Sequence, residues 1–352
     1  MKFKFMSMAA LAAIVTFTSC TNDDEVAGNN HYAALSKVSV GINHMTNSRA
    51  GITAKNFSGD NIAIGMFLFG PNGVTEAYNE VDANGNMKDP LNIKYYRGVE
   101  NQNEYFVSDN AIILSSKLGK LYSYYPYSEN AGTDATAIPV KLSASQGTGI
   151  SDGTVDNGTT DYMYSDVVSN VCNTTTHVDV KMNHALAMVT FKFVRKSYTG
   201  EGKIDLIKLS NKQDGTYVKV GDGTMDITTG SVTATTAGAV YCEPKVILTG
   251  KEATVEIPHM LVYPTATEMA KGDVLLTIVM DGVTYEIDLP HTLAGDAGEA
   301  YKWTKGNNYV YTLTMTGRGF GNSSDDQNDI DVTITEWNDV PVANGDLANP
   351  KK

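Results

Sequence analysis

The sequence predicts an all-β protein with two β-sandwich domains in tandem. Apolar and polar residues alternate with a period of two along many short segments, which is the pattern of half-buried strands. These segments are rich in Tyr, Val, Ile and Thr, and Gly, Asn and Asp separate them. Many short strands at this spacing are typical of two sheets packed face to face.

The first half of the chain contains a series of expected strands. Residues 37–42 alternate strictly, and IAIGMFLF at 62–69 is apolar on both faces, so we expect it to be buried on both sides. In the later segment KLYSYYPY, Tyr122 and Tyr124 share one face, and we expect them to fill a core rather than to stack on a sugar. Residues 145–161 are expected to form a long loop. The other expected strands lie in NIKYYRGV, EYFVSDNAIIL and IPVKLSA.

The second strand-rich region starts near His177. Asp281-Gly282 is a pair favoured in two-residue hairpin turns. The polar linker 321–329 precedes a last strand, DIDVTITEW. We therefore expect domains at 36–175 and 176–352, with a C-terminal strand at 330–337. The other expected strands lie in HVDVKMNHALAMVTFKFV, KIDLIKLS, GTYVKV, ATVEIPHMLVYP, DVLLTIVMDGVTYEIDLP and NYVYTLTMTG.

A leader precedes these domains. Two lysines begin it, and the apolar residues 6–17 are too few to span a bilayer as a helix. Phe17-Thr18-Ser19-Cys20 resembles a bacterial lipobox, in which the cysteine is acylated and becomes the new N-terminus. The acids at 23–25 resemble an export signal for surface lipoproteins. We expect a lipoprotein signal peptide at 1–19, lipidation of Cys20 and a tether at 20–35.

Composition and motifs exclude several classes of function. The net charge is −13, from 27 basic and 40 acidic residues, which argues against a nucleic-acid partner. No zinc-binding HExxH and no complete phosphate-binding loop occurs. The string GISDG at 149–153 matches G-x-S-x-G, but it lies in the expected loop and not at a strand-to-helix turn, so it is no nucleophile elbow. We therefore expect no enzyme, no catalytic residue, no cofactor and no metal.

Two features stay open at this stage. Asp152, Asp156 and Asp161 carry oxygen ligands that calcium prefers, but their spacing matches no known calcium loop, so solvated acids are the better interpretation. Cys172 and Cys242 either pair in an oxidising compartment or are separate buried thiols.

Four segments, spread in order over nearly the whole chain, resemble one known family. They are the lipobox leader, NSRAGITAKNFSGDNIAIGMFLF, TTDYMYSD leading to VKMNHALAMVTFKF, and KGNNYVYTLTMT followed by DVTITEWND. Together they resemble the fimbrillins, the subunits of type V pili in Bacteroidia, and their fimbrillin-like relatives. The resemblance implies two transthyretin-like sandwiches and a structural or adhesive role.

The resemblance also implies a processing step. In that family a trypsin-like protease cuts after an arginine at the place of Arg49, which would make Ala50 the new N-terminus. The cut would remove the strand within 36–49 and expose an apolar groove with unpaired backbone groups, a template for another chain's strand. The candidate donor strand alternates in the same way, and its residues are Ile330, Val332 and Ile334, with Trp337 as a plug. The same strand is alternatively the last strand of its own domain.

The sequence thus predicts a stalk, tip or anchor subunit of a surface pilus. It is expected to reach the cell surface as an outer-membrane lipoprotein precursor and to enter a fimbria after processing. Its expected partners are other pilus subunits, the trypsin-like protease, and a host or bacterial surface glycan or protein. The alternative is a surface lipoprotein that binds a glycan without assembling, and a third hypothesis is a surface glycan-degrading enzyme.

The first prediction concerns Cys20. Cys20→Ala should abolish labelling of the protein by a fatty-acid probe and release it from the membrane, because each buried methylene of an acyl chain contributes roughly 0.8 kcal/mol. Cys172→Ala is the matched control and should keep both label and membrane association. Unchanged labelling of Cys20→Ala would show that this cysteine is not the anchor.

Overall fold

The structure, a computed structural model, describes most of the predicted strands. The described residues are 32–42, 62–81, 87–100, 103–147, 149–151, 154–156, 160–196, 198–249, 254–289, 302–316, 319–320 and 330–336. They form strands and loops with the short 3-10 helices η2 (Gly73–Thr75) and η3 (Glu129–Ala131), and they contain no α-helix. Within these ranges, neither helix is long and apolar enough to cross a membrane. The all-β prediction is confirmed.

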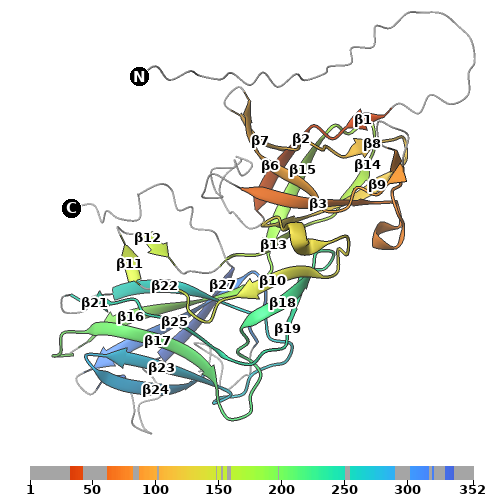
Figure 1. Cartoon of the computed structure of the whole chain (residues 1–352). Helices are drawn as coiled ribbons and strands as arrows, with labels where there is room; N and C mark the ends of the chain where they lie inside the picture. The colour runs from red at the N-terminus through yellow and green to blue at the C-terminus, as the bar shows by residue number, and fades with distance from the viewer. Residues whose placement is uncertain are drawn as a thin grey trace, which may run out of the picture.

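The N-terminal half is an eight-stranded sheet that curls round one core (Figure 1). Its order is β13-β15-β2-β7-β6-β3-β9-β14, and β13 also pairs with β9, so the sheet closes on itself. The two sheets expected here are therefore joined edge to edge. The strands are β2 (Lys37–Ile42), β3 (Ala63–Phe69), β6 (Ile93–Glu100), β7 (Asn103–Val107), β9 (Gly119–Tyr125), β13 (Met163–Ser165), β14 (Val168–Val171) and β15 (His177–His184).

Two short strand pairs accompany this sheet. β1 (Ala33–Ala34) pairs with β8 (Ile113–Leu114), and β4 (Glu80–Val81) pairs with β5 (Met87–Lys88). The pairing of β1 carries the chain directly into β2.

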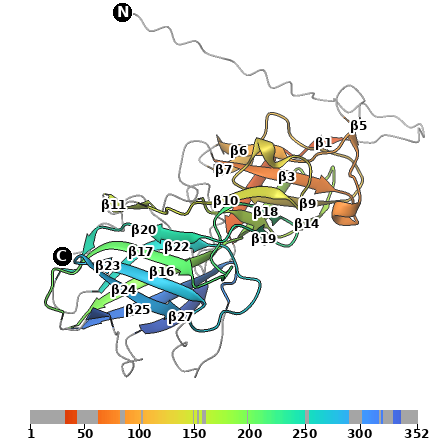
Figure 2. The same cartoon turned by 60° about the horizontal axis from the view of Figure 1, so that its bottom comes forward.

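The C-terminal half is a sandwich of two layers, as expected (Figure 2). One layer contains β16 (Ala187–Arg195), β22 (Thr254–Val262), β25 (Asn307–Thr316), β26 (Gly319–Phe320) and β27 (Ile330–Glu336). The other contains β17 (Lys203–Asn211), β20 (Ala239–Cys242), β21 (Val246–Ile247), β23 (Val274–Met280) and β24 (Val283–Leu289). The hairpin between β23 and β24 turns at Asp281-Gly282, where φ is 50° and 75°.

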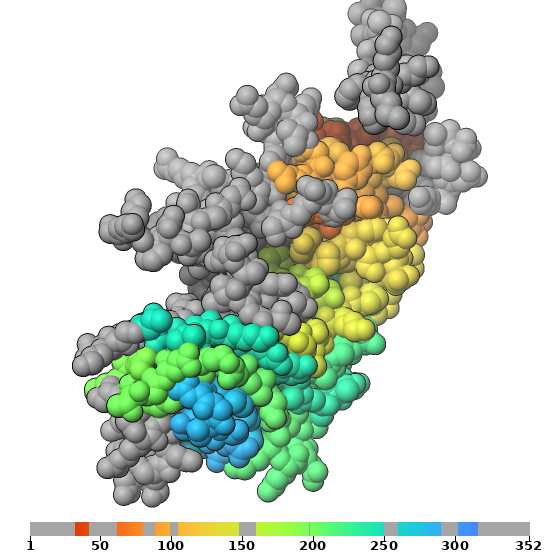
Figure 3. Space-filling view, turned by 60° about the vertical axis from the view of Figure 1, so that its left-hand side comes forward, coloured from red at the N-terminus to blue at the C-terminus, as the bar shows by residue number. Residues whose placement is uncertain are grey.

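A third, small sheet joins the two halves. β10 (Ile138–Leu142) comes from the first half of the sequence but pairs with β18 (Gly221–Asp226), which pairs with β19 (Ser231–Ala234). The part of the chain that carries β9 and β10, coloured yellow, lies between the orange N-terminal strands and the C-terminal part (Figure 3). β15 in turn belongs to the N-terminal sheet, and Ala185 belongs to the C-terminal core. The domain boundary at residue 176 itself stays a prediction.

Some local expectations differ from the structure. The expected loop at 145–161 contains a small hairpin, β11 (Gly149–Ser151) with β12 (Thr154–Asp156). The segment GTYVKV is irregular apart from one bridge at Lys219. The polar strand β18 was not expected from its sequence, GDGTMD, because only Met225 in it is apolar. It forms because β10 and β19 satisfy its backbone on both sides.

β3 lies between two hydrophobic cores, which confirms that it is buried on both faces. Ile64, Met66 and Leu68 belong to the core inside the N-terminal sheet. Phe67 and Phe69 belong to the second core, which extends through the C-terminal sandwich. Tyr122 and Tyr124 of β9 are also buried in that second core, so these tyrosines fill a core, as expected.

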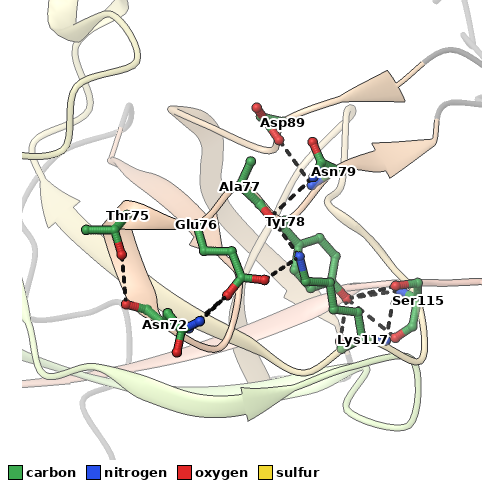
Figure 4. Close-up of polar contacts among 9 residues, drawn as sticks. All are labelled: Asn72, Thr75, Glu76, Ala77, Tyr78, Asn79, Asp89, Ser115 and Lys117. Atoms are coloured by element: carbon green, nitrogen blue, oxygen red, sulfur yellow. Dashed lines mark hydrogen bonds and ion pairs between the residues drawn. The ribbon is translucent and has the colours of Figure 1, made fainter.

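Polar contacts tie the β3–β4 connection to the loop before β9 (Figure 4). The buried Tyr78 hydroxyl donates to the carbonyl of Lys117 at 2.9 Å and accepts from the amide of Ser115 at 3.0 Å. The Lys117 ammonium lies 2.9 Å from Glu76, and this hydrogen bond lowers the pKa of the Glu76 carboxyl. The network holds the chain next to β8, the partner of β1.

The second prediction compares two glycines in strands. A Cβ on Gly65 would lie 2.0 Å from the Tyr124 ring, whereas a Cβ on Gly41 would meet nothing closer than 3.7 Å. Gly65→Ala should lower the free energy of unfolding by about 1–3 kcal/mol through overpacking. Gly41→Ala, the control, should be neutral or raise it by up to about 1 kcal/mol. Urea unfolding measures both, and equal effects would contradict the packing of β3 on β9.

Candidate functional site

β2 is an interior strand of the N-terminal sheet, although it precedes the expected cleavage site. It pairs in parallel with β15, from Lys37 opposite His177 to Ile42 opposite Met182. On its other side it pairs antiparallel with β7, with Val38 opposite Phe106. Backbone groups of both neighbours therefore depend on β2 for partners. Without β2, the edges of β15 and β7 would face each other across an empty place.

The inner face of this segment is part of the core. Leu35 and Val38 are 0% exposed and Val40 is 3% exposed. They belong to the same cluster as Phe106 of β7 and Val178 of β15. Removal of the segment would therefore leave an apolar groove. The side chain of Ile42 lies outside the described residues.

Hydrogen bonds extend the attachment upstream of β2. The Tyr95 hydroxyl donates to the carbonyl of Leu35 at 3.0 Å and accepts from the amide of Ile112 at 3.0 Å. The amide of Leu35 donates to the carbonyl of Ile112, and the amide of Ser36 donates to the carbonyl of Thr176. Leu35, which stands at the end of the expected tether, is thus buried and hydrogen-bonded between β1 and β2.

Two rings meet over the outer face of β2. Tyr105 of β7 and His177 of β15 make an edge-to-face contact with centroids 5.5 Å apart. The Lys37 ammonium lies 5.1 Å from the Tyr105 ring centroid, and the Ser39 hydroxyl is hydrogen-bonded to Nε2 of His177 at 2.7 Å. We name the two rings the Tyr105–His177 clasp. Sequence reasoning missed it because its two rings lie on strands that are far apart in the chain.

The candidate donor strand is paired within its own sandwich. β27 runs antiparallel to β25, with Ile330 opposite Leu313, Val332 opposite Tyr311 and Ile334 opposite Tyr309. These three residues of β25 are buried. The pairing corresponds to the alternative in which the strand completes its own domain. The side chains of β27, and Trp337, lie outside the described residues.

The processing and lipidation sites also lie outside the described residues. Cys20, Arg49 and Ala50 fall in this part of the chain; the described strands on either side of the expected cut are β2 and β3. The two cysteines left open by the sequence are both free thiols. Burial raises the pKa of the Cys242 thiol to about 12.

No metal centre is found among the residues that the structure describes. They contain no group of three or more His, Cys, Asp or Glu side chains placed to hold an ion. Of the acids considered for calcium, Asp161 is hydrogen-bonded through its carboxylate to Nδ1 of the buried His184 at 2.8 Å. This carboxylate is used in a structural pair.

An open hollow of about 490 Å³ lies beside the β23–β24 turn. Tyr198, Lys203 and Asp281 are among its lining residues. The Asp281 carboxylate accepts hydrogen bonds from the Tyr198 hydroxyl and from the amides of Gly202 and Lys203. Burial alone would raise the pKa of Asp281, but these hydrogen bonds outweigh it and hold the pKa below its usual value. The carboxylate therefore fixes the loops around the turn.

Comparison with known proteins identifies a family and solved structures with a similar fold. Residues 48–337 match the profile of a family described as fimbrillin-like. A search of curated proteins found no match. A protein of Bacteroides ovatus, described as a cell adhesion protein, is 19% identical, with a TM-score of 0.57 over 87% of this chain and 99% of its own.

A second solved structure has a similar fold. A protein of Bacteroides uniformis with the same description is 17% identical, with a TM-score of 0.52 over 86% of this chain and 98% of its own. These likenesses show that the fold extends over nearly the full length of both relatives.

Proposed function

Because this chain belongs to the fimbrillin-like family, it is a pilus subunit with a role in adhesion, and we propose that it matures by strand exchange. In this proposal the chain is exported as a surface lipoprotein, cut after Arg49 and joined to other subunits through the place of β2. A structural role without catalysis is part of the same proposal.

The observation that carries the proposal is the interior position of β2. A cut after Arg49 would leave β2 in the sheet without a covalent link to β3 and the rest of the fold. Before the cut, the linked strand returns to its place at a high effective concentration and excludes competitors. After the cut, β2 is one separate strand competing with others. Cleavage would thus act as the step that permits exchange.

Energetics favour refilling of the groove. Each of the three buried side chains Leu35, Val38 and Val40 contributes about 1.5–3 kcal/mol of burial. The backbone groups of β7 and β15 would also lose their partners. An empty groove is therefore costly, and a second strand with the same alternation regains most of that free energy.

The sequence and the position of β27 support its proposed role as the donor strand. Ile330, Val332 and Ile334 repeat the spacing of Val38, Val40 and Ile42. The polar linker at 321–329 precedes it, and β27 joins the sandwich through β25. Its release would uncover the edge of β25, so its place in its own sandwich remains the competing explanation.

Processing also changes how the protein is held. The expected lipid anchor at Cys20 lies on the fragment that the cut separates, so a processed copy would be held by its neighbours in the fibre. A copy that escapes the cut would keep both its lipid and its filled groove. The proposed partners are other subunits, a trypsin-like protease, and a surface glycan or protein.

The third prediction is that Arg49 is the cleavage site. N-terminal sequencing of the surface protein from its native cells should give Ala50. Arg49→Ala should keep the fragment 1–49 attached and prevent entry into polymers, because the linked β2 fills the groove. Lys55→Ala, a nearby control, should leave processing unchanged. Polymers of normal length from Arg49→Ala would contradict the proposal.

The fourth prediction separates the two roles of β27. The double variant Val332→Asp/Ile334→Asp should lose polymers while its monomer stays folded, because charged residues cannot occupy an apolar groove. Thr333→Asp/Thr335→Asp, at the alternate positions, is the matched control and should still polymerise. Gel laddering reports assembly, and circular dichroism reports folding. Unfolding of the monomer would assign β27 to its own domain and require another donor.

A further inference from the structure

The Tyr105–His177 clasp lies where an exchanging strand must fit. Its rings come from the two strands that flank β2, and they meet over the outer face of β2. Any strand that takes the place of β2 has to pass beneath the same two rings. The inner face of the groove recognises apolar residues of many kinds, whereas the clasp contacts specific polar groups.

The contacts of the clasp indicate which groups it accepts. The face of a tyrosine ring carries negative potential, so it attracts the Lys37 ammonium. Two residues later, the Ser39 hydroxyl is hydrogen-bonded to His177. The carboxylate of Asp179 lies 3.8 Å from the same imidazole, which adds negative charge beside this position. The clasp therefore suits a basic residue followed by a hydroxyl group.

This chain's own C-terminal strand does not match that pattern. When Ile330, Val332 and Ile334 take the places of Val38, Val40 and Ile42, Asp329 falls at the place of Lys37 and Asp331 at the place of Ser39. A carboxylate is repelled by the face of Tyr105, and Asp331 would come close to Asp179. Space is not the obstacle, because a Cβ at the place of Gly41 meets nothing closer than 3.7 Å.

We propose that the Tyr105–His177 clasp selects the strand that refills the groove. It favours a strand from a different subunit, with a basic residue at the place of Lys37 and a hydroxyl two residues later. It disfavours the C-terminal strand of another copy of this chain, so β27 would donate to the groove of a different subunit. The inference rests on the proposed function, and it makes the groove a hetero-subunit contact.

The test measures displacement of the cleaved fragment from the full chain. The Cys172→Ala protein, produced without lipidation, carries a fluorophore on Cys20 and is nicked after Arg49 by an arginine-specific protease, with the single cut verified by mass. Synthetic peptides then compete with the labelled fragment 1–49. They are residues 36–44, the same peptide with Lys37→Glu, residues 328–337, and the last peptide with Asp329→Lys.

Peptides with the basic residue should displace the fragment at lower concentration. Lys37→Glu should raise the half-displacement concentration about fivefold, and Asp329→Lys should lower it by a similar factor. Tyr105→Ala in the protein should abolish both differences. Lys181→Ala should preserve them, because Lys181 stands on β15 opposite Gly41, which has no side chain.

The possible results distinguish a failure of the clasp from a failure of strand exchange. Equal competition by the native and the Asp329→Lys peptides, or a difference that persists in Tyr105→Ala, overturns the selection by the clasp. Failure of every peptide, including residues 36–44, means that the groove does not exchange strands. That last outcome refutes the proposed function itself and, with it, the inference.

Discussion

An interior strand of a sheet needs a partner on each side, because its neighbours' amides and carbonyls must be hydrogen-bonded. In the N-terminal half this requirement falls on β2, which stands between β15 and β7. Its inner side chains also close the core. A strand is required at this position for three reasons. It pairs with β15 and β7, it closes the apolar core, and it makes the contacts with the clasp on the outer face. The identity of the strand that fills it is a separate matter.

The rest of the molecule provides a firm frame for that place. β3 contributes one face to each of two cores, and Gly65 allows it to lie against Tyr124. β10 crosses to pair with β18, and β15 leads directly into β16. Because the second core joins β3 and β9 to the C-terminal sandwich and does not include β2, loss of β2 would leave most of that frame in contact. A groove in a stable frame is better suited to accept a strand than one in a loosened sheet.

Several of these features were predictable from local sequence. Strict alternation identified β2, a doubly apolar run identified β3, and Asp281-Gly282 identified a hairpin turn. The neighbours of β2 were not predictable, because register between strands far apart in the chain is decided by tertiary packing. Ser39 and His177 stand 138 positions apart. The polar strand β18 was not predictable either, because it is stabilised by its pairing with β10 and β19.

The central claim is that the place of β2 is emptied and refilled during maturation. Amide hydrogen exchange of β15 and β7 tests it most directly, measured on the uncut chain, on the processed monomer and on assembled fibres. The account predicts strong protection in the uncut chain, weaker protection in the processed monomer, where the severed β2 leaves its place more readily, and strong protection again in fibres. Protection that stays unchanged through all three states would show that β2 never leaves and would contradict the account.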